Sequence, residues 1–130
     1  MKTSSSPGAE ILLVDDEPDL REDLAFLLTD EGFVVRTAAN GAEALGLLEA
    51  GARPSVILLD LMMPVMDGWE TRARLRATPE LARIPIIVLS GFANDDRDIA
   101  ALDVAAYLAK PIGVGRLREV VERTLALDRG

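Results

Sequence analysis

Three carboxylates, one hydroxyl and one amine each follow a short apolar segment of this sequence. Asp15 and Asp16 come after the first such segment, Asp60 after the third, Ser90 after the fourth and Lys110 after the fifth. Short, continuously apolar segments indicate strands buried on both faces of a parallel sheet, where ligands and chemistry lie at the carboxyl ends. Adjacent parallel strands lie about 4.8 Å apart, so we expect these side chains to converge on one pocket.

The chemistry expected of such a pocket is metal-assisted phosphoryl transfer. Three carboxylates within roughly 4 to 5 Å repel by several kcal/mol at an effective dielectric near 20, so a fold gathers them around a cation. The chain has no cysteine and no histidine, which leaves an oxygen-ligated Mg²⁺, or Mn²⁺, as the metal. Asp60 can then act as the nucleophile that forms an aspartyl-phosphate, with Lys110 as a second positive charge and Ser90 as a hydroxyl donor.

Each of these residues alone also has a purely structural explanation. Acids at strand ends cap helix N-termini, and a lysine beside them neutralises their charge. The set as a whole is what favours a functional site.

Composition restricts the partners and the setting. The 130 residues include 14 basic and 22 acidic side chains, for a formal net charge of -8, which argues against binding to nucleic acid or to an anionic membrane. The length suits a single domain. The apolar runs are too short for a signal peptide or a membrane span, so we expect a soluble, cytoplasmic protein.

The elements that must position the site alternate regularly along the chain. Apolar runs predict five strands: Ile11–Val14, Phe33–Ala38, Val56–Leu59, Ile86–Leu89 and Ala105–Ala109. Helical spacing, caps and glycines predict five helices: Pro18–Glu31 with an acid before it as N-cap, Gly41–Ala50 capped by Asn40, one from Asp67 to just before Thr78, a short fourth from Asn94–Asp96 through Leu102, and Val114–Leu127. Strict β-α alternation predicts a doubly wound α/β domain with a parallel sheet, over residues 10–128, after a disordered tail at residues 1–9. Arg36 and Thr37 break the second apolar run, which places that strand at a sheet edge.

Four motifs, in this order and at this spacing, resemble the receiver domain of bacterial two-component response regulators: Val14–Glu17, Asp60–Gly68, Ser90-Gly91 and Tyr107–Pro111. The resemblance extends over about Glu10 to Leu127. It implies a flavodoxin-like fold with strand order 2-1-3-4-5, and a switch controlled by phosphorylation rather than an enzyme acting on a separate substrate.

The resemblance also implies a role for each matching position. Asp60 matches the phosphoacceptor, which receives its phosphoryl group from a phosphohistidine of a sensor histidine kinase or histidine phosphotransfer protein. Asp16 matches the direct Mg²⁺ ligand, Asp15 a ligand acting largely through water, and Met62 a ligand through its backbone carbonyl. Lys110 matches the site lysine, and its bond to Pro111 is typically cis.

Two further positions match the residues that report phosphorylation. Ser90 matches the hydroxyl that turns toward the phosphoryl group, and Tyr107 matches the aromatic that changes rotamer with it. The alternative for Tyr107 is ordinary packing at a strand edge.

Two enzyme families that could share this fold do not fit the sequence. A flavodoxin would need a phosphate-binding loop where this chain has Asp15-Asp16-Glu17, and a haloacid dehalogenase-type phosphatase would need a second acid where this chain has Met62.

One segment departs from the family pattern. The stretch from Ser90 to Lys110 is shorter than usual, and Asp103 replaces the glycine that usually ends the fourth helix. The output surface near this helix is therefore expected to differ, with a monomer or weak homodimer as the assembly. The end of the chain at Gly130 favours a stand-alone switch acting on an unknown downstream protein. A receiver fragment of a larger regulator or hybrid kinase, or an interaction module that signals without phosphorylation, are the alternatives.

Two apolar residues flank the expected phosphorylation site, Met62 two positions after Asp60 and Phe92 two after Ser90. In the family these positions tune attack of water on the aspartyl-phosphate, so we predict a long-lived phosphoryl group; ordinary variation at a pocket rim is the alternative. Phe92→Lys and Met62→Asn should both speed phosphoryl loss, followed by the decay of the phosphorylated mass. An unchanged decay in both variants would contradict this prediction.

Overall fold

The computed structural model describes residues 8–91 and 104–129. Its parallel strands are β1 (Glu10–Val14), β2 (Val34–Ala38), β3 (Val56–Asp60), β4 (Ile86–Ser90) and β5 (Ala106–Ala109). They form one sheet of order β2-β1-β3-β4-β5, as the family resemblance implies, with β2 at an edge. The helices within the described ranges are α1 (Pro18–Asp30), α2 (Gly41–Glu49), α3 (Gly68–Arg76), α4 (Pro79–Ala82) and α6 (Val114–Arg129). The helix expected from Asn94–Asp96 to Leu102 and most of the expected tail lie outside the described residues, and the division at residues 9 and 10 stays a prediction.

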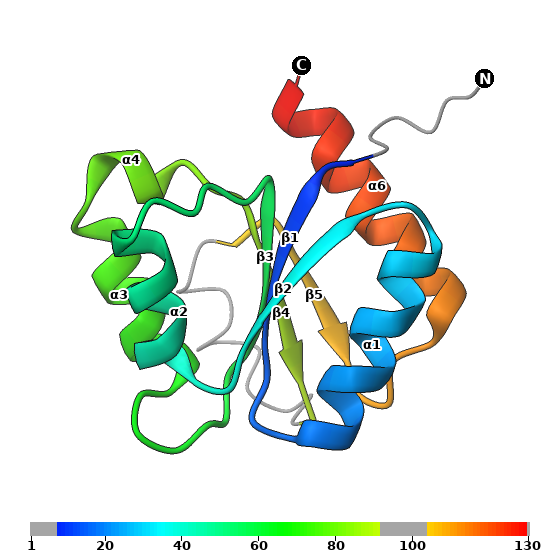
Figure 1. Cartoon of the computed structure of the whole chain (residues 1–130), viewed down its shortest axis with the longest axis horizontal. Helices are drawn as coiled ribbons and strands as arrows, with labels where there is room; N and C mark the ends of the chain where they lie inside the picture. The colour runs from blue at the N-terminus through cyan, green and yellow to red at the C-terminus, as the bar shows by residue number, and fades with distance from the viewer. Residues whose placement is uncertain (1–7, 92–103, 130) are drawn as a thin grey trace.

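Helices cover both faces of the sheet. Figure 1 shows α2, α3 and α4 on one side and α1 and α6 on the other. Successive residues of β3 alternate between the two resulting cores: Ile57 and Leu59 pack with α2, α3 and α4, whereas Val56 and Leu58 pack with α1 and α6. This double cover explains the continuous apolar runs in the sequence. No helix in the described ranges is long and apolar enough to span a membrane.

The helix boundaries follow local signals at α2 and α3. The side chain of Asn40 accepts the Glu43 N–H at 2.9 Å, and the side chain of Asp67 accepts the Glu70 N–H at 2.9 Å. These bonds satisfy N–H groups that a helix leaves without an internal partner.

Helix α1 departs from the expected capping. Glu17 occupies the N-cap position before Pro18, but its side chain makes no capping hydrogen bond. The acid therefore precedes the helix, as expected, without capping it. At the other end Gly32 has a φ of 102°, the left-handed conformation that favours glycine after a helix.

A one-turn helix, α4, follows α3 and was not predicted. The sequence at Thr78-Pro79 indicates the end of a helix, because proline disfavours helical geometry in the residue before it. Pro79 also suits the first position of a new helix, since its missing N–H needs no partner there. The turn buries Leu81 in the core between the sheet and helices α2 and α3, which we call the α2–α3 core.

The loop between β3 and α3 makes a tight turn at the carboxyl end of β3. Met66 N–H donates to the Pro64 carbonyl at 2.7 Å across Val65, whose φ of 71° is unusual for a β-branched residue. Gly68 N–H donates to the Leu61 carbonyl at 2.9 Å. A Cβ added at Gly68 would lie 2.7 Å from the Leu61 Cα, so only glycine allows this return of the chain.

The same loop also contacts the start of α2. Gly41 N–H donates to the Met66 carbonyl at 3.3 Å. A Cβ at Gly41 would collide with the Thr71 hydroxyl and would lie 3.0 Å from that carbonyl. The loop after β3 is therefore packed against both α2 and α3.

We predict that Gly68→Ala lowers the free energy of unfolding by about 2 kcal/mol or more, because backbone atoms surround the added methyl group. Gly46 is the matched control: it is exposed on α2 with open space around it, so Gly46→Ala should raise the free energy of unfolding by about 0.5 to 1 kcal/mol. Urea unfolding measures both variants. A Gly68→Ala protein as stable as the wild type would contradict the close packing described here.

Candidate functional site

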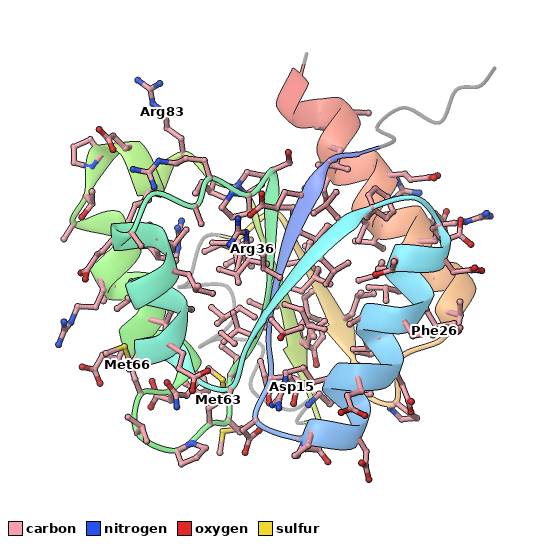
Figure 2. The ribbon with its side chains drawn as sticks, in the orientation of Figure 1. Asp15, Phe26, Arg36, Met63, Met66 and Arg83 are labelled. Carbon is pink, nitrogen blue, oxygen red and sulfur yellow. The ribbon has the colours of Figure 1, made fainter. Side chains whose placement is uncertain are left out.

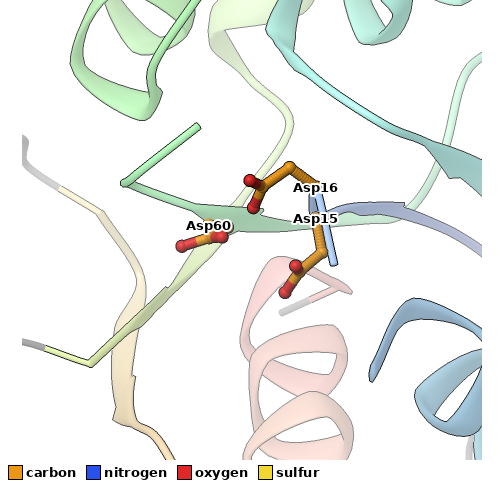
Figure 3. Close-up of side chains that lie close together, drawn as sticks. All are labelled: Asp15, Asp16 and Asp60. Carbon is orange, nitrogen blue, oxygen red and sulfur yellow. The ribbon is translucent and has the colours of Figure 1, made fainter. Parts of the chain in front are cut away.

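Three carboxylates meet at the carboxyl ends of β1 and β3. Val14 pairs with Leu59 across these strands, so Asp15 and Asp60, the next residue in each chain segment, emerge side by side. One carboxylate oxygen from each of Asp15, Asp16 and Asp60 lies within 4.8 Å of the other two. Figure 3 shows the three side chains gathered in one place. Asp15 and Asp60 are buried and Asp16 is half-buried. The sequence-based expectation that strand ends bring these acids together matches this placement.

A single lysine from the fifth strand joins the acids. Lys110 follows β5, and its backbone N–H donates to the Ser90 carbonyl at 2.8 Å, which continues the pairing with β4. Its Nζ lies 3.2 Å from Asp15 Oδ2 and 3.3 Å from Asp60 Oδ2. The side chain is 17% exposed. The Lys110–Pro111 peptide bond is cis, as in the family pattern.

The electrostatics of the pair follow from burial and close charges. Burial raises the pKa of Asp60 from 3.8 to about 6; Lys110 opposes this rise, Asp15 adds to it, and the Met62 N–H, which donates to Asp60 Oδ1 at 3.2 Å, opposes it. Burial lowers the pKa of Lys110, but the charges of Asp60 and Asp15 outweigh it and leave that pKa raised. Lys110 is therefore a fixed cation beside a carboxylate that resists ionisation.

The acids open onto a pocket of about 280 Å³. Its lining residues are Asp16, Glu17, Asp60, Met62, Gly91 and Lys110. Both oxygens of Asp15 are engaged, one by the Glu17 N–H at 2.9 Å and one by Lys110. Among the described residues Asp16 has no hydrogen-bond or ion-pair partner. A partly buried carboxylate without a partner, beside two further carboxylates, fits a hard divalent cation such as Mg²⁺ or Mn²⁺.

The remaining predicted site residues surround this centre. Ser90 is buried at the end of β4, and its neighbour Gly91 lines the pocket. Tyr107, in β5, lies opposite Val88 of β4 and packs against the α2–α3 core. Its hydroxyl is buried and finds no hydrogen-bond partner within residues 8–91 and 104–129. Met62 is at the pocket rim and 51% exposed. Phe92 lies outside the described residues.

Sequence reasoning missed one residue of the pocket. Glu17 Oε1 lies 3.4 Å from Lys110 Nζ, which makes Glu17 a third carboxylate partner of this lysine. The signal in the sequence was the third consecutive acid after the first strand. The sequence predicts only a helix-capping role for this acid, because nothing in it shows that the side chain turns toward Lys110.

We predict that Asp60→Asn stabilises the ion-free protein at neutral pH. The pKa of Asp60 is higher in the folded state, about 6, than its ordinary value of 3.8, so the folded protein binds a proton at Asp60 more tightly than the unfolded chain does. The protonated side chain therefore favours the folded state fully below about pH 4, and this contribution to stability is lost as the pH rises through about 6. Asparagine cannot ionise, so the variant should gain about 2 kcal/mol in free energy of unfolding near pH 7.5, and less near pH 5. Urea unfolding in EDTA measures both. Asp30→Asn, at an exposed site, is the control; equal stability of Asp60→Asn and wild type at both pH values would contradict the prediction.

Comparison with known proteins identifies this arrangement. The family described as the response regulator receiver domain matches residues 11–122. The chain is 40% identical over 116 residues to an uncharacterised 14.6 kDa protein of Leptolyngbya boryana, with 88% of each chain covered. It is 39% identical over 120 residues to the response regulator MprA of a Mycobacterium species (strain KMS), which covers 88% of this chain and 51% of MprA. The chain thus spans about half the length of that regulator.

Solved structures give the same answer. The receiver domain of a Pseudomonas aeruginosa sensor histidine kinase, described with a magnesium ion coordinated in its active-site cleft, superposes with a TM-score of 0.85 at 32% identity, covering 92% of this chain and 98% of that one. The chemotaxis response regulator CheY4 of Vibrio cholerae superposes with a TM-score of 0.83 at 32% identity, covering 90% and 98%. The fold, the strand order and the family match agree, and the chain belongs to the response regulator receiver domain family of two-component systems.

Proposed function

We propose that this chain is a phosphorylation-dependent signalling switch whose phosphoacceptor is Asp60. One observation carries the proposal: a buried carboxylate at the end of β3 lies 3.3 Å from Lys110 and within 4.8 Å of the carboxylates of Asp15 and Asp16. The phosphoryl donor is a phosphohistidine on a sensor histidine kinase or a histidine phosphotransfer protein, the donors that serve the receiver family.

The transfer is a direct displacement at phosphorus. An Asp60 carboxylate oxygen forms a bond to phosphorus while the bond from phosphorus to the donor nitrogen breaks, and its electron pair leaves with the imidazole. The departing nitrogen takes up a proton from solvent. Asp60 must be ionised to attack, and its pKa of about 6 leaves most molecules ionised at neutral pH. Lys110 is placed to donate a hydrogen bond to a phosphoryl oxygen.

A divalent cation would be held by Asp16, Asp15, Asp60 and the backbone carbonyl of Met62. When bound, Mg²⁺ or Mn²⁺ supplies positive charge that offsets the charge on the phosphoryl oxygens. Asp16 suits direct ligation because its carboxylate is free among the described residues. Asp15 suits ligation through water, because both its oxygens already accept hydrogen bonds. The magnesium-containing receiver domain from Pseudomonas aeruginosa supports the choice of metal.

The signal leaves the site through Ser90 and Tyr107. Ser90 is the last residue of β4, next to Gly91 of the pocket, and Tyr107 lies in the neighbouring strand with its hydroxyl buried. Turning of Ser90 toward the phosphoryl group, followed by rotation of Tyr107, changes the surface offered to a downstream protein. We propose that the protein binds neither nucleic acid nor membrane directly and acts on no separate substrate. We also propose that it is a monomer or a weak homodimer. Because the chain spans half of MprA, the same switch could act inside a longer regulator.

We predict that the protein gains one phosphoryl group on incubation with acetyl phosphate and Mg²⁺, and that Asp60→Asn does not. Intact-mass measurement follows the modification, and a peptide map places it. Trp69, partly buried against the α2–α3 core one residue after Gly68, should change its fluorescence on addition of Mg²⁺ with beryllofluoride. EDTA should abolish both responses.

An interaction module that signals without phosphorylation is the competing function. A protein that stays unmodified at Asp60, with Trp69 fluorescence unchanged by beryllofluoride, would overturn the switch and favour that alternative.

A further inference from the structure

Glu17 lies at the start of α1, but its side chain does not cap the helix. It is the N-cap residue of α1, where Ser, Thr, Asp or Asn normally accepts a helix N–H. Its side chain makes no such bond. The carboxylate extends instead toward the phosphorylation pocket, which it helps to line.

The backbone of Glu17 is held on both sides. Its N–H donates to Asp15 Oδ1 at 2.9 Å, and its carbonyl accepts the Arg21 N–H at 2.9 Å. Pro18 follows it in the first turn of α1. The side chain therefore starts from a fixed point at the pocket mouth, and its Oε1 reaches 3.4 Å from Lys110 Nζ while remaining 63% exposed.

Lys110 is consequently shared among three carboxylates. Its Nζ lies 3.2 Å from Asp15, 3.3 Å from Asp60 and 3.4 Å from Glu17. An ammonium group has three N–H donors, so three partners occupy all of them. A phosphoryl group on Asp60 needs one of these donors, and the exposed Glu17 is the partner that is displaced most easily.

We propose that Glu17 is a specificity-determining residue that disfavours small, highly anionic phosphodonors. Its carboxylate adds a negative charge at the pocket mouth, where a free donor must enter, and it competes for Lys110. The inference rests on the proposed phosphorylation of Asp60. Whichever small donor is used, an Asp60 oxygen bonds to phosphorus while the bond from phosphorus to the donor's oxygen or nitrogen breaks. The electron pair of the broken bond leaves on that oxygen or nitrogen. A donor with fewer negative charges is repelled less.

Two small donors of different charge test this role. Acetyl phosphate is a dianion at neutral pH, and phosphoramidate carries one negative charge fewer. Glu17→Gln keeps the shape of the side chain and removes the charge. We expect it to raise the rate of phosphorylation by acetyl phosphate about threefold, and by phosphoramidate less, with both gains shrinking as salt is added. Beryllofluoride should also bind the variant more tightly, measured by Trp69 fluorescence in Mg²⁺.

Glu22 provides the matched control. It is exposed on α1, and its side chain makes no ion pair or hydrogen bond among the described residues, so Glu22→Gln removes the same charge from outside the pocket. Wild-type rates in Glu17→Gln, or equal acceleration by Glu22→Gln, would overturn the role of Glu17 while leaving Asp60 as the phosphoacceptor. If neither donor phosphorylates the wild type or Glu17→Gln, and beryllofluoride leaves Trp69 fluorescence unchanged in both, the proposed function itself is overturned.

Discussion

The ammonium group of Lys110 is the interaction on which the arrangement of this site depends. Two buried carboxylates, Asp15 and Asp60, lie within 4.8 Å of each other and of Asp16, and each such pair repels by about 3 kcal/mol at an effective dielectric near 20. Lys110 offsets part of that repulsion. Burial is the main cause of the raised pKa of Asp60, and the charge of Asp15 adds to it. A bound divalent cation would neutralise the negative charge that Lys110 leaves uncompensated.

The sheet supplies the alignment that this interaction requires. Asp60 pairs with Leu89, and Ser90 pairs with Ala109. The polar residues at or just after the end of each strand therefore emerge along one edge of the sheet. Because strand side chains alternate between faces, a slip of one residue in β3 would turn Asp60 away from Lys110. The two apolar cores on either side of the sheet (Figure 2) resist such a slip, since it would also exchange every β3 side chain between them.

Much of this organisation could be predicted because it depends on periodicity and strand ends. Apolar runs predict the strands, and the convergence of parallel strand ends predicts that Asp15, Asp60 and Lys110 lie together. Features that depend on three-dimensional contacts could not be predicted in this way. In the sequence Pro79 indicates only the end of a helix, although the same ring starts α4. The partner of Glu17 is 93 residues away in the chain, and the positive φ of Val65 opposes the usual preference of its side chain.

The close approach at Gly41 has a mechanical consequence. The carbonyl of Met66, in the loop that leaves the phosphoacceptor strand, touches the first residue of α2 with no space for even a methyl group between them. A side chain at position 41 would have to push aside both the loop and the Thr71 hydroxyl of α3. The loop that leaves β3, the start of α2 and the first turn of α3 therefore form one close-packed unit, which depends on glycine at position 41.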